Sequence, residues 1–275
     1  MSICPRVNLV NHTRRYCGEP STGVCNKCVK ENGGHDSLEM SLGEFDWDVE
    51  KWRVFHGSKL SRARRIFAPS RDTAMRLERY FPELKIDVRP HPEKITRLTS
   101  IPRSSEKITN VIFLGAIGIH KGFDYLVGCA EHAQVYHLPI KFHVIGYTAD
   151  DNALANYSNV KLYGEYETDT LPALLKQTKA NVAALLSVCP ETFSYTFSEA
   201  QQHGLKVISF DLGALQERIK NESGVVIPLY SSFEDICHSM ITLSASAKTQ
   251  ITNGKVYSSI SRYYYDFEKT ENGLA

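Results

Sequence analysis

The chain contains no apolar run long enough to cross a bilayer, and Met1 is not followed by the apolar core of a signal peptide. Charge of either sign is not in excess, because 32 Lys and Arg residues face 31 Asp and Glu residues, a formal net charge of +1. These absences argue against a membrane-spanning or secreted chain and against electrostatic binding of nucleic acid. We expect a cytoplasmic protein whose 275 residues suffice for one large domain or two modest ones.

Two nucleotide-binding fingerprints are also missing. The Gly-x-Gly-x-x-Gly spacing of dinucleotide-binding folds does not occur, and there is no Gly-Lys-Ser/Thr of a Walker loop. Nor does an acid follow about twenty residues later, at the end of a second strand. An oxidoreductase that uses a dinucleotide is therefore disfavoured.

From about Lys107 onward, apolar runs alternate with helical patterns. The expected strands are residues 108–114, 140–145, 160–163, 183–188, 206–210 and 225–228. One expected helix begins near Phe123, and the others cover residues 170–177, 194–203, 212–219 and 233–243. Asp169 is the expected cap of the helix that starts at 170, and Pro172 lies in its first turn. This alternation predicts an α/β fold with a Rossmann-like, doubly wound parallel sheet.

The first hundred residues have a different pattern. Residues 49–55 and 59–65 are expected to be helices, 66–68 and 86–88 strands, and 70–80 a helix capped by Ser70. Residues 93–106 are polar and resemble a linker, and residues 256–267 carry an aromatic stripe at helical spacing. The predicted division is a Cys-rich segment 1–40, a region 41–105 ending in the linker, a sheet domain 106–250 and a terminal helix 251–275 that packs back on the N-terminal region.

Two glutamates stand out between residues 190 and 200. Glu191 should lie in the loop beyond the strand at 183–188, and Glu199 about one turn inside the next helix. Ligands of open α/β sheets bind at the carboxyl ends of the strands. The helix amides near Ser194 to Thr196 can receive an anion, and Glu199 can accept hydrogen bonds from a diol. The alternative is that each acid is an ordinary capping or surface residue.

A glycine-rich turn follows the strand at 108–114. Gly115, Gly118 and Gly122 let backbone amides approach an anion, and Lys121 adds a full positive charge at a helix start. The alternative reading of this turn is a tight connection between a strand and a helix. We interpret it as a phosphate site because of the paired acids.

Together these residues resemble the donor-binding half of retaining glycosyltransferases with two facing Rossmann-like domains, the GT-B architecture. The family is the large one that includes sucrose and glycogen synthases (glycosyltransferase family 4-like). Its glycine turn with Lys-Gly falls on Gly115, Gly118 and Lys121-Gly122, and its paired acids fall on Glu191 and Glu199. Its later glycine and acid fall on Gly213 and Glu217, and Pro69-Ser70 and His91-Pro92 resemble the end of its acceptor-side domain.

The resemblance implies sugar transfer from a nucleotide-diphosphate sugar to a hydroxyl acceptor, with retention of configuration and without a catalytic metal. Glu191 is then the catalytic residue that faces the sugar, and Glu199 holds the ribose. The implied donor-binding residues are Gly115, Gly118, Lys121, Phe193, Ser194, Tyr195, Thr196 and Glu199. Typical acceptors of such enzymes are carbohydrates or glycolipids in polysaccharide or glycoconjugate synthesis, which can place the enzyme peripherally at the inner face of a membrane. No nucleic-acid partner is expected.

Three departures from the family pattern bear on activity. Ala116 stands where many members carry an arginine, so Lys121 should carry more of the phosphate charge, with help from His120. Ser194 replaces a usual glycine. Most of the acceptor-side domain is missing from the sequence. The second hypothesis is therefore a nucleotide-binding, zinc-stabilised module that is inactive without a separate acceptor-domain partner.

Four of the seven cysteines lie in the first 28 residues. Cys25-Asn26-Lys27-Cys28 has the spacing of a metal knuckle, and Cys4 and Cys17 would complete a structural zinc site, with His12 or His35 as a substitute ligand. The alternative is free cysteines in a loop. Cys129, Cys189 and Cys237 are expected to be small buried hydrophobes.

Overall fold

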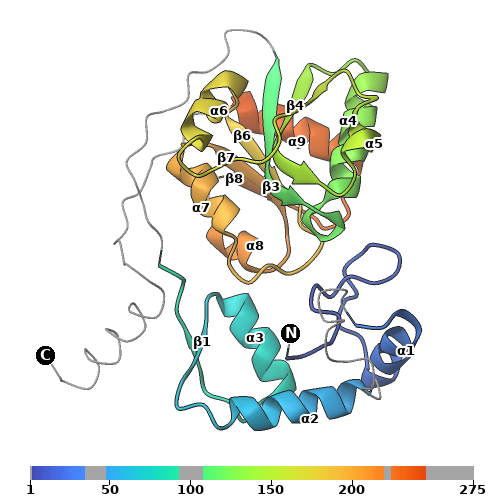
Figure 1. Ribbon diagram of the computed structural model, residues 1–275, viewed down its shortest axis with the longest axis vertical. Coiled ribbons are helices and arrows are strands. Elements are labelled where there is room, and N and C mark those ends of the chain that lie inside the picture. The colour runs from blue at the N-terminus through green and yellow to red at the C-terminus, as the bar shows by residue number, and fades with distance from the viewer. Residues whose placement is uncertain (1, 35–47, 93–107, 220–223, 246–275) are drawn as a thin grey trace, which may run out of the picture.

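The computed structural model describes residues 2–34, 48–92, 108–219 and 224–245 (Figure 1). The predicted linker at 93–106 and the aromatic stripe at 256–267 lie outside these residues. Two lobes are visible, an upper one built on a six-stranded sheet and a lower one that carries the N-terminus. None of the helices in the described part of the chain has the length and apolar character needed to cross a membrane.

The large sheet confirms the predicted doubly wound fold. Its strands are β3 (Thr109–Ile117), β4 (Ile140–Thr148), β5 (Val160–Leu162), β6 (Val182–Leu185), β7 (Lys206–Phe210) and β8 (Gly224–Ile227). They lie in the order β5-β4-β3-β6-β7-β8, and every neighbouring pair is parallel. The order reverses between β3 and β6, which makes the carboxyl ends of these two strands the topological switch point where ligands of such sheets bind.

Helices cover both faces of this sheet, as Figure 1 shows. One face is covered by α4 (Phe123–Val135), α5 (Asp151–Leu154) and α9 (Phe233–Ala245), and the other by α6 (Leu171–Thr178), α7 (Tyr195–Gln202) and α8 (Ala214–Arg218). In β3, Val111 and Phe113 join the core under α4 and α9, while Ile112 and Leu114 join the core under α6 and α7. The strand reads as a continuous apolar run because both of its faces are buried.

Several details of the sheet domain differ from the sequence prediction, and strand β6, for example, ends at Leu185 rather than at residue 188. Strand β3 continues past Gly115 to Ile117, because β4 extends beside it and pairs Ile117 with Thr148. The cap of α6 is Thr170 rather than Asp169, and the Thr170 hydroxyl donates to the carbonyl of Glu167 instead of capping the helix. Pro172 does lie in the first turn of α6, as predicted.

The lower lobe contains α1 (Thr22–Asn32), α2 (Val49–Leu60), β1 (Ile66–Ala68), α3 (Arg71–Tyr80) and β2 (Ile86–Val88). Strands β1 and β2 pair in parallel, and Ser70 caps α3 by accepting a hydrogen bond from the amide of Thr73 at 3.2 Å, as predicted. The prediction of two helices at 49–55 and 59–65 was wrong. A single helix runs to Leu60, because Gly57 packs its backbone against the ring of Phe81 instead of breaking the helix.

Polar contacts join the two lobes on both sides of the molecule. Near the N-terminus, Arg14 forms a 2.9 Å ion pair with Asp124 in the first turn of α4, and the Tyr230 hydroxyl donates to the carbonyl of Tyr16. On the other side, the Glu217 carboxylate of α8 accepts hydrogen bonds from the amides of Arg71 and Asp72 at the start of α3. Acids are favourable at a helix N-terminus, so Glu217 joins the lobes through the backbone of α3.

Candidate functional site

The predicted glycine turn lies at the carboxyl end of β3. After β3, Gly118 leads into a single 3₁₀ turn, Ile119–Lys121, and Gly122 then begins α4 with φ +90°. A side chain on Gly122 would place its Cβ 2.3 Å from the carbonyl oxygen of Leu186, just beyond β6. Gly122 is therefore required by packing, because it lets the turn approach the end of β6 and brings Lys121 to the switch point.

Lys121 and Glu191 form an ion pair, with 2.9 Å between Nζ and Oε2. The Glu191 side chain is only 8 % exposed, while that of Lys121 is 34 % exposed. The other carboxylate oxygen of Glu191 accepts a short hydrogen bond from the buried hydroxyl of Ser187. Sequence reasoning placed Lys121 and Glu191 at the same edge but did not predict that they pair. It missed Ser187, which has no signal beyond its place after an apolar run.

The start of α7 contains the residues expected to meet a diphosphate. Ser194 has φ +73° and ψ 94°, so it keeps a backbone conformation that glycine adopts more easily. Its side chain bonds Thr196 at 3.0 Å. A Cβ at Gly115 would lie 3.2 Å from the Thr196 methyl group, so the exit of β3 and the start of α7 are immediate neighbours.

Arg218 of α8 fixes the geometry of this turn. Its guanidinium donates to the carbonyls of Phe193 and Ser194 at 2.9 and 2.8 Å. In a trans peptide the N–H points away from the C=O, so the amides of Ser194 and Tyr195 are directed away from Arg218. The guanidinium also lies 4.0 Å from the centre of the Phe193 ring. Sequence reasoning identified Gly213 and Glu217 beside it but missed Arg218.

His91, a residue of the lower lobe, contacts this turn. Its ring stacks on Tyr195, with 5.9 Å between centroids and 7° between planes, and meets Phe193 edge-on at 5.0 Å. Burial and the nearby Arg218 both lower the pKa of His91. A neutral ring at this position avoids placing a second cation beside the guanidinium.

Glu199 lies in α7, as predicted, and its carboxylate is half-buried. The hydroxyl of Tyr166 donates to Glu199 Oε2 at 3.1 Å. Burial raises the pKa of Glu199, and the hydrogen bond from Tyr166 acts in the opposite direction. Tyr166 was missed by sequence reasoning, because nothing in the local pattern after β5 indicates contact with α7.

Glycines line the carboxyl ends of three neighbouring strands. Gly115 of β3 pairs in register with Gly146 of β4, and the amide of Gly146 donates to the carbonyl of Gly164 at 2.8 Å. A Cβ on Gly146 would lie 2.1 Å from the oxygen of Gly115. The missing side chain at Gly146 thus lets β4 lie close to Gly115, and the missing side chain at Gly115 leaves space for the Thr196 methyl group. A glycine at the end of successive predicted strands was the available signal for this feature.

The predicted zinc site is not supported. Among the described residues, which include all four N-terminal cysteines, no group of three or more Cys, His, Asp or Glu side chains is placed to hold a metal ion. Three of the thiols bond elsewhere instead. Cys17 accepts from the amide of Glu19, Cys25 donates to the carbonyl of Pro20 and also contacts Arg53, and Cys28 contacts the Asn32 amide group. Burial raises the pKa of Cys4 to about 11, which disfavours its thiolate.

The cysteines of the sheet domain behave as predicted. Cys129 and Cys237 are fully buried in the core between α4 and α9, and Cys189 is 7 % exposed. Burial raises the pKa of Cys189 to about 12, which keeps it a neutral thiol beside Glu191. His12, the alternative ligand, is exposed, and His35 lies outside the described residues.

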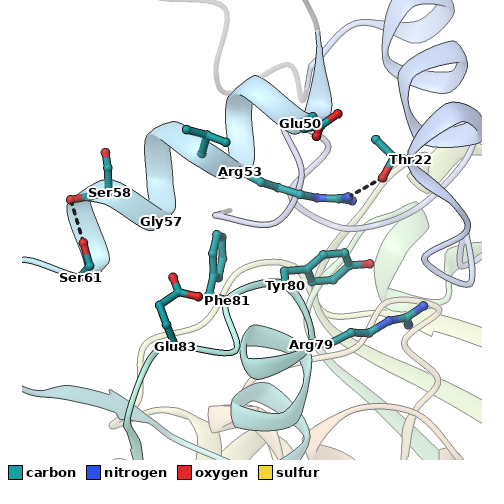
Figure 2. A pocket seen from close by; sticks show the side chains of 11 residues that line it. Thr22, Glu50, Arg53, Gly57, Ser58, Ser61, Arg79, Tyr80, Phe81 and Glu83 are labelled. Atoms are coloured by element: carbon teal, nitrogen blue, oxygen red, sulfur yellow. Dashed lines mark hydrogen bonds between the residues drawn. The ribbon is translucent and has the colours of Figure 1, made fainter.

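A pocket of about 580 Å³ lies in the lower lobe between α2 and the end of α3 (Figure 2). It contains none of the predicted donor-binding residues. Arg53 crosses it above the ring of Tyr80 and donates to the Ile3 carbonyl at 2.9 Å and to the Thr22 hydroxyl at 3.4 Å. Arg79 donates to the carbonyl of Glu19. These arginines hold the N-terminal segment against α2 and α3.

A known protein family matches the sheet domain. Residues 108–246, half of the chain, match the family described as "Glycosyl transferases group 1". A curated relative from Klebsiella pneumoniae, described as an uncharacterized 41.2 kDa protein in the cps region, is 29 % identical over 154 residues. That match covers 55 % of this chain and only 40 % of the relative.

Solved glycosyltransferase structures share the fold. Sucrose-phosphate synthase from Thermosynechococcus elongatus superposes with a TM-score of 0.59 at 15 % identity, over 93 % of this chain and 67 % of that one. The lipopolysaccharide outer core galactosyltransferase WaaB gives 0.57 at 16 %, over 91 % and 72 %. Staphylococcus aureus TarM, solved with UDP, gives 0.57 at 18 %, over 71 % and 40 %. At these identities the likeness concerns the fold alone.

Proposed function

Because the chain belongs to the group 1 glycosyl transferases, we propose that it transfers a sugar from a nucleotide-diphosphate sugar to a hydroxyl acceptor. One observation carries the proposal. The glycine turn after β3 and the acid-bearing segment after β6 meet at the switch point of the sheet, where Lys121 contacts Glu191 at 2.9 Å. A cation, a carboxylate and nearby helix-start amides, with Glu199 farther along the same helix, suit a ligand that has both a diphosphate and hydroxyls.

Lys121 and the amides at the start of α7 stabilise the departing diphosphate. An ammonium group has three donors, and the ion pair with Glu191 uses one of them. The remaining donors are available for phosphate oxygens that gain charge as the glycosidic bond breaks. Arg218 keeps the carbonyls of Phe193 and Ser194 turned away from that charge.

In this proposal Glu191 contacts the transferred sugar and Glu199 contacts the ribose. Glu191, the proposed catalytic residue, is fixed by Lys121 and Ser187 beside the diphosphate position, where it orients the sugar hydroxyls. Glu199, farther along α7, accepts a hydrogen bond from a ribose hydroxyl, as it does from the Tyr166 hydroxyl.

We further propose that the reaction retains the anomeric configuration and serves polysaccharide or glycoconjugate synthesis. The description of the Klebsiella relative places it in the cps region, and WaaB is described as a lipopolysaccharide outer core galactosyltransferase. The description of WaaB names lipopolysaccharide, which supports a carbohydrate or glycolipid acceptor. The proton coupling at the new anomeric centre, read by NMR of the product, distinguishes retention from inversion.

The test of donor binding is a panel of UDP-, GDP-, ADP-, CMP- and dTDP-linked sugars screened by thermal shift and followed by calorimetry. We expect one nucleotide-diphosphate class to raise the melting temperature, and Glu199→Ala to weaken its binding at least tenfold. Binding that is unchanged in Glu199→Ala, or no shift with any donor, contradicts the proposal.

As a second function we propose a donor-binding module that works with a separate acceptor domain. The matched share is 40 % of the Klebsiella protein and of TarM, 67 % of sucrose-phosphate synthase and 72 % of WaaB. Donor hydrolysis assayed alone and with the N-terminal half of the Klebsiella relative separates the two functions, because a module gains activity only in the mixture.

A further inference from the structure

We propose that Tyr166 is a positioning residue for Glu199, whose carboxylate it holds in the orientation that receives a ribose hydroxyl of the donor. The inference rests on the proposed function, because it takes Glu199 as the ribose-binding acid. Its starting point is a contact between segments far apart in the chain. Tyr166 follows β5 at the edge of the sheet, Glu199 lies inside α7, and their side chains meet at 3.1 Å.

The backbone around Tyr166 is held on both sides. Before it, the amide of Tyr163 donates to the carbonyl of Val144 at 2.9 Å, which ties the segment to β4. After it, the amides of Thr170 and Leu171 donate to the carbonyl of Glu167, which ties the segment to the start of α6. The Tyr166 ring is partly buried against the core under α6 and α7. The hydroxyl is therefore presented to Glu199 from a fixed position.

The hydrogen bond from Tyr166 leaves the Glu199 carboxylate able to accept further hydrogen bonds. Tyr166 donates to Oε2, and a carboxylate accepts about four hydrogen bonds in all, so Oε1 and further lone pairs remain. A half-buried carboxylate is also at risk of taking up a proton, since burial raises its pKa. A donor to the charged form opposes that rise. Tyr166 thus favours an ionised acceptor with a set orientation.

The other charged groups around α7 are engaged elsewhere. Glu191 pairs with Lys121, and Arg218 binds the carbonyls of Phe193 and Ser194 and the hydroxyl of Ser198. Burial lowers the pKa of His203 at the end of α7, so this neighbour is neutral at pH 7. Tyr166 is the group whose hydrogen bond lowers the pKa of Glu199.

The first measurement needs no nucleotide. The chain is labelled with ¹³C at the glutamate carboxyl carbons, and the Glu199 signal, assigned by its loss in Glu199→Gln, is titrated from pH 3.5 to 8. Tyr166→Phe removes only the hydroxyl, so we expect the pKa of Glu199 to rise in this variant. Tyr136→Phe, which alters an exposed tyrosine at the end of α4, is the control and should leave the titration unchanged. An unchanged Glu199 titration in Tyr166→Phe overturns the inference.

The second measurement is calorimetry with UDP and GDP and their 2′-deoxy and 3′-deoxy analogues. We expect Tyr166→Phe to weaken the better-bound ribonucleotide about tenfold, as for a lost hydrogen bond to a charged group. The preference for the ribonucleotide over its deoxy analogue should shrink in the same variant. A purely structural role predicts equal losses for all analogues, and that outcome also overturns the inference.

The two measurements separate this inference from the proposed function. If no nucleotide of the donor panel binds the wild type, the proposed function is disproved. The role of Tyr166 in ribose binding is then disproved with it, even where the titration shifts. If Glu199→Gln weakens binding and Tyr166→Phe does not, the proposed function survives and the role of Tyr166 is disproved. If both variants weaken binding and the double variant adds nothing to Glu199→Gln, Tyr166 acts through Glu199.

Discussion

Lys121 and Glu191 reach one another from the exits of two different strands, and their 2.9 Å ion pair spans the switch point of the sheet. The pair explains how a half-exposed turn and a buried loop form one site. Lys121 is anchored by a carboxylate that itself bonds Ser187, so the ammonium is already placed before any ligand arrives. Such preorganisation lowers the cost of stabilising an anion that develops later.

Loss of the Lys121 ammonium should weaken mainly the binding of the phosphate groups. We expect Lys121→Ala to weaken binding of a nucleoside diphosphate at least tenfold and to change binding of the parent nucleoside little, because the nucleoside carries no phosphate charge. Calorimetry with UDP and uridine, or the matching pair for the preferred base, measures both. Lys176→Ala, at an exposed lysine of α6, is the matched control. Equal losses for diphosphate and nucleoside would rule out phosphate contact at Lys121.

The same substitution should also destabilise the fold. Lys121→Ala leaves the Glu191 carboxylate, 8 % exposed, without its cation, and an unpaired buried charge costs roughly 1–3 kcal/mol after allowance for the partly exposed lysine. Adding Glu191→Gln removes the charge, so the double variant should recover most of the loss in urea unfolding. It should not recover diphosphate binding. A double variant no more stable than Lys121→Ala would show that an unpaired Glu191 charge is not the cause of the loss.

His143 makes the stability of the sheet domain depend on pH. Its ring is buried between Asn110 at 2.9 Å and Tyr163 at 3.0 Å, an arrangement that the neutral ring satisfies with one donor and one acceptor. Burial, and then Lys161 and Lys141, lower the pKa of His143 from 6.5 to about 4. Because the folded pKa is depressed, this stabilisation is complete above pH 6.5 and is lost as pH falls toward 4.

The expected loss from His143 is at most about 3 kcal/mol over that window. Urea unfolding at steps between pH 7.5 and 4 should show it, and His143→Gln should flatten the difference between the two ends. His238→Gln, at an exposed histidine of α9, serves as the control. An identical pH profile for wild type and His143→Gln would disprove the assignment.

The sheet domain was largely predictable from the sequence because each strand is buried on both faces and each helix on one. That physical constraint leaves a readable pattern, so β7 was placed at its observed bounds and α9 within two residues. Contacts between distant segments leave no such pattern. Tyr166 reaches Glu199, and Ser187 reaches Glu191, through the three-dimensional path of loops that follow the strands.

In the N-terminal segment, the sequence pattern predicted a metal site that the structure does not support. The spacing of Cys25 and Cys28 suited a metal knuckle, but both residues lie on α1, a helix that the sequence did not predict. On that helix Cys25 faces Pro20 and Arg53, while Cys28 contacts Asn32 one turn later. Spacing alone does not fix the direction of a side chain, which depends on the element that carries it.

Substitution of Gly122 distinguishes the two interpretations of the glycine turn, a ligand-binding loop and a tight connection between a strand and a helix. In Gly122→Ala the new methyl group would lie 2.3 Å from the Leu186 carbonyl oxygen at a backbone φ of +90°. We expect a loss of more than about 2 kcal/mol in unfolding free energy, since strain and overlap add. Gly204→Ala is the matched control, because Gly204 also has a positive φ, +70°, but open space around its Cα. It should cost only about 1 kcal/mol. If the two variants were equally stable, packing against Leu186 would not be the reason for glycine at this position, and contact with the ligand would become the stronger explanation.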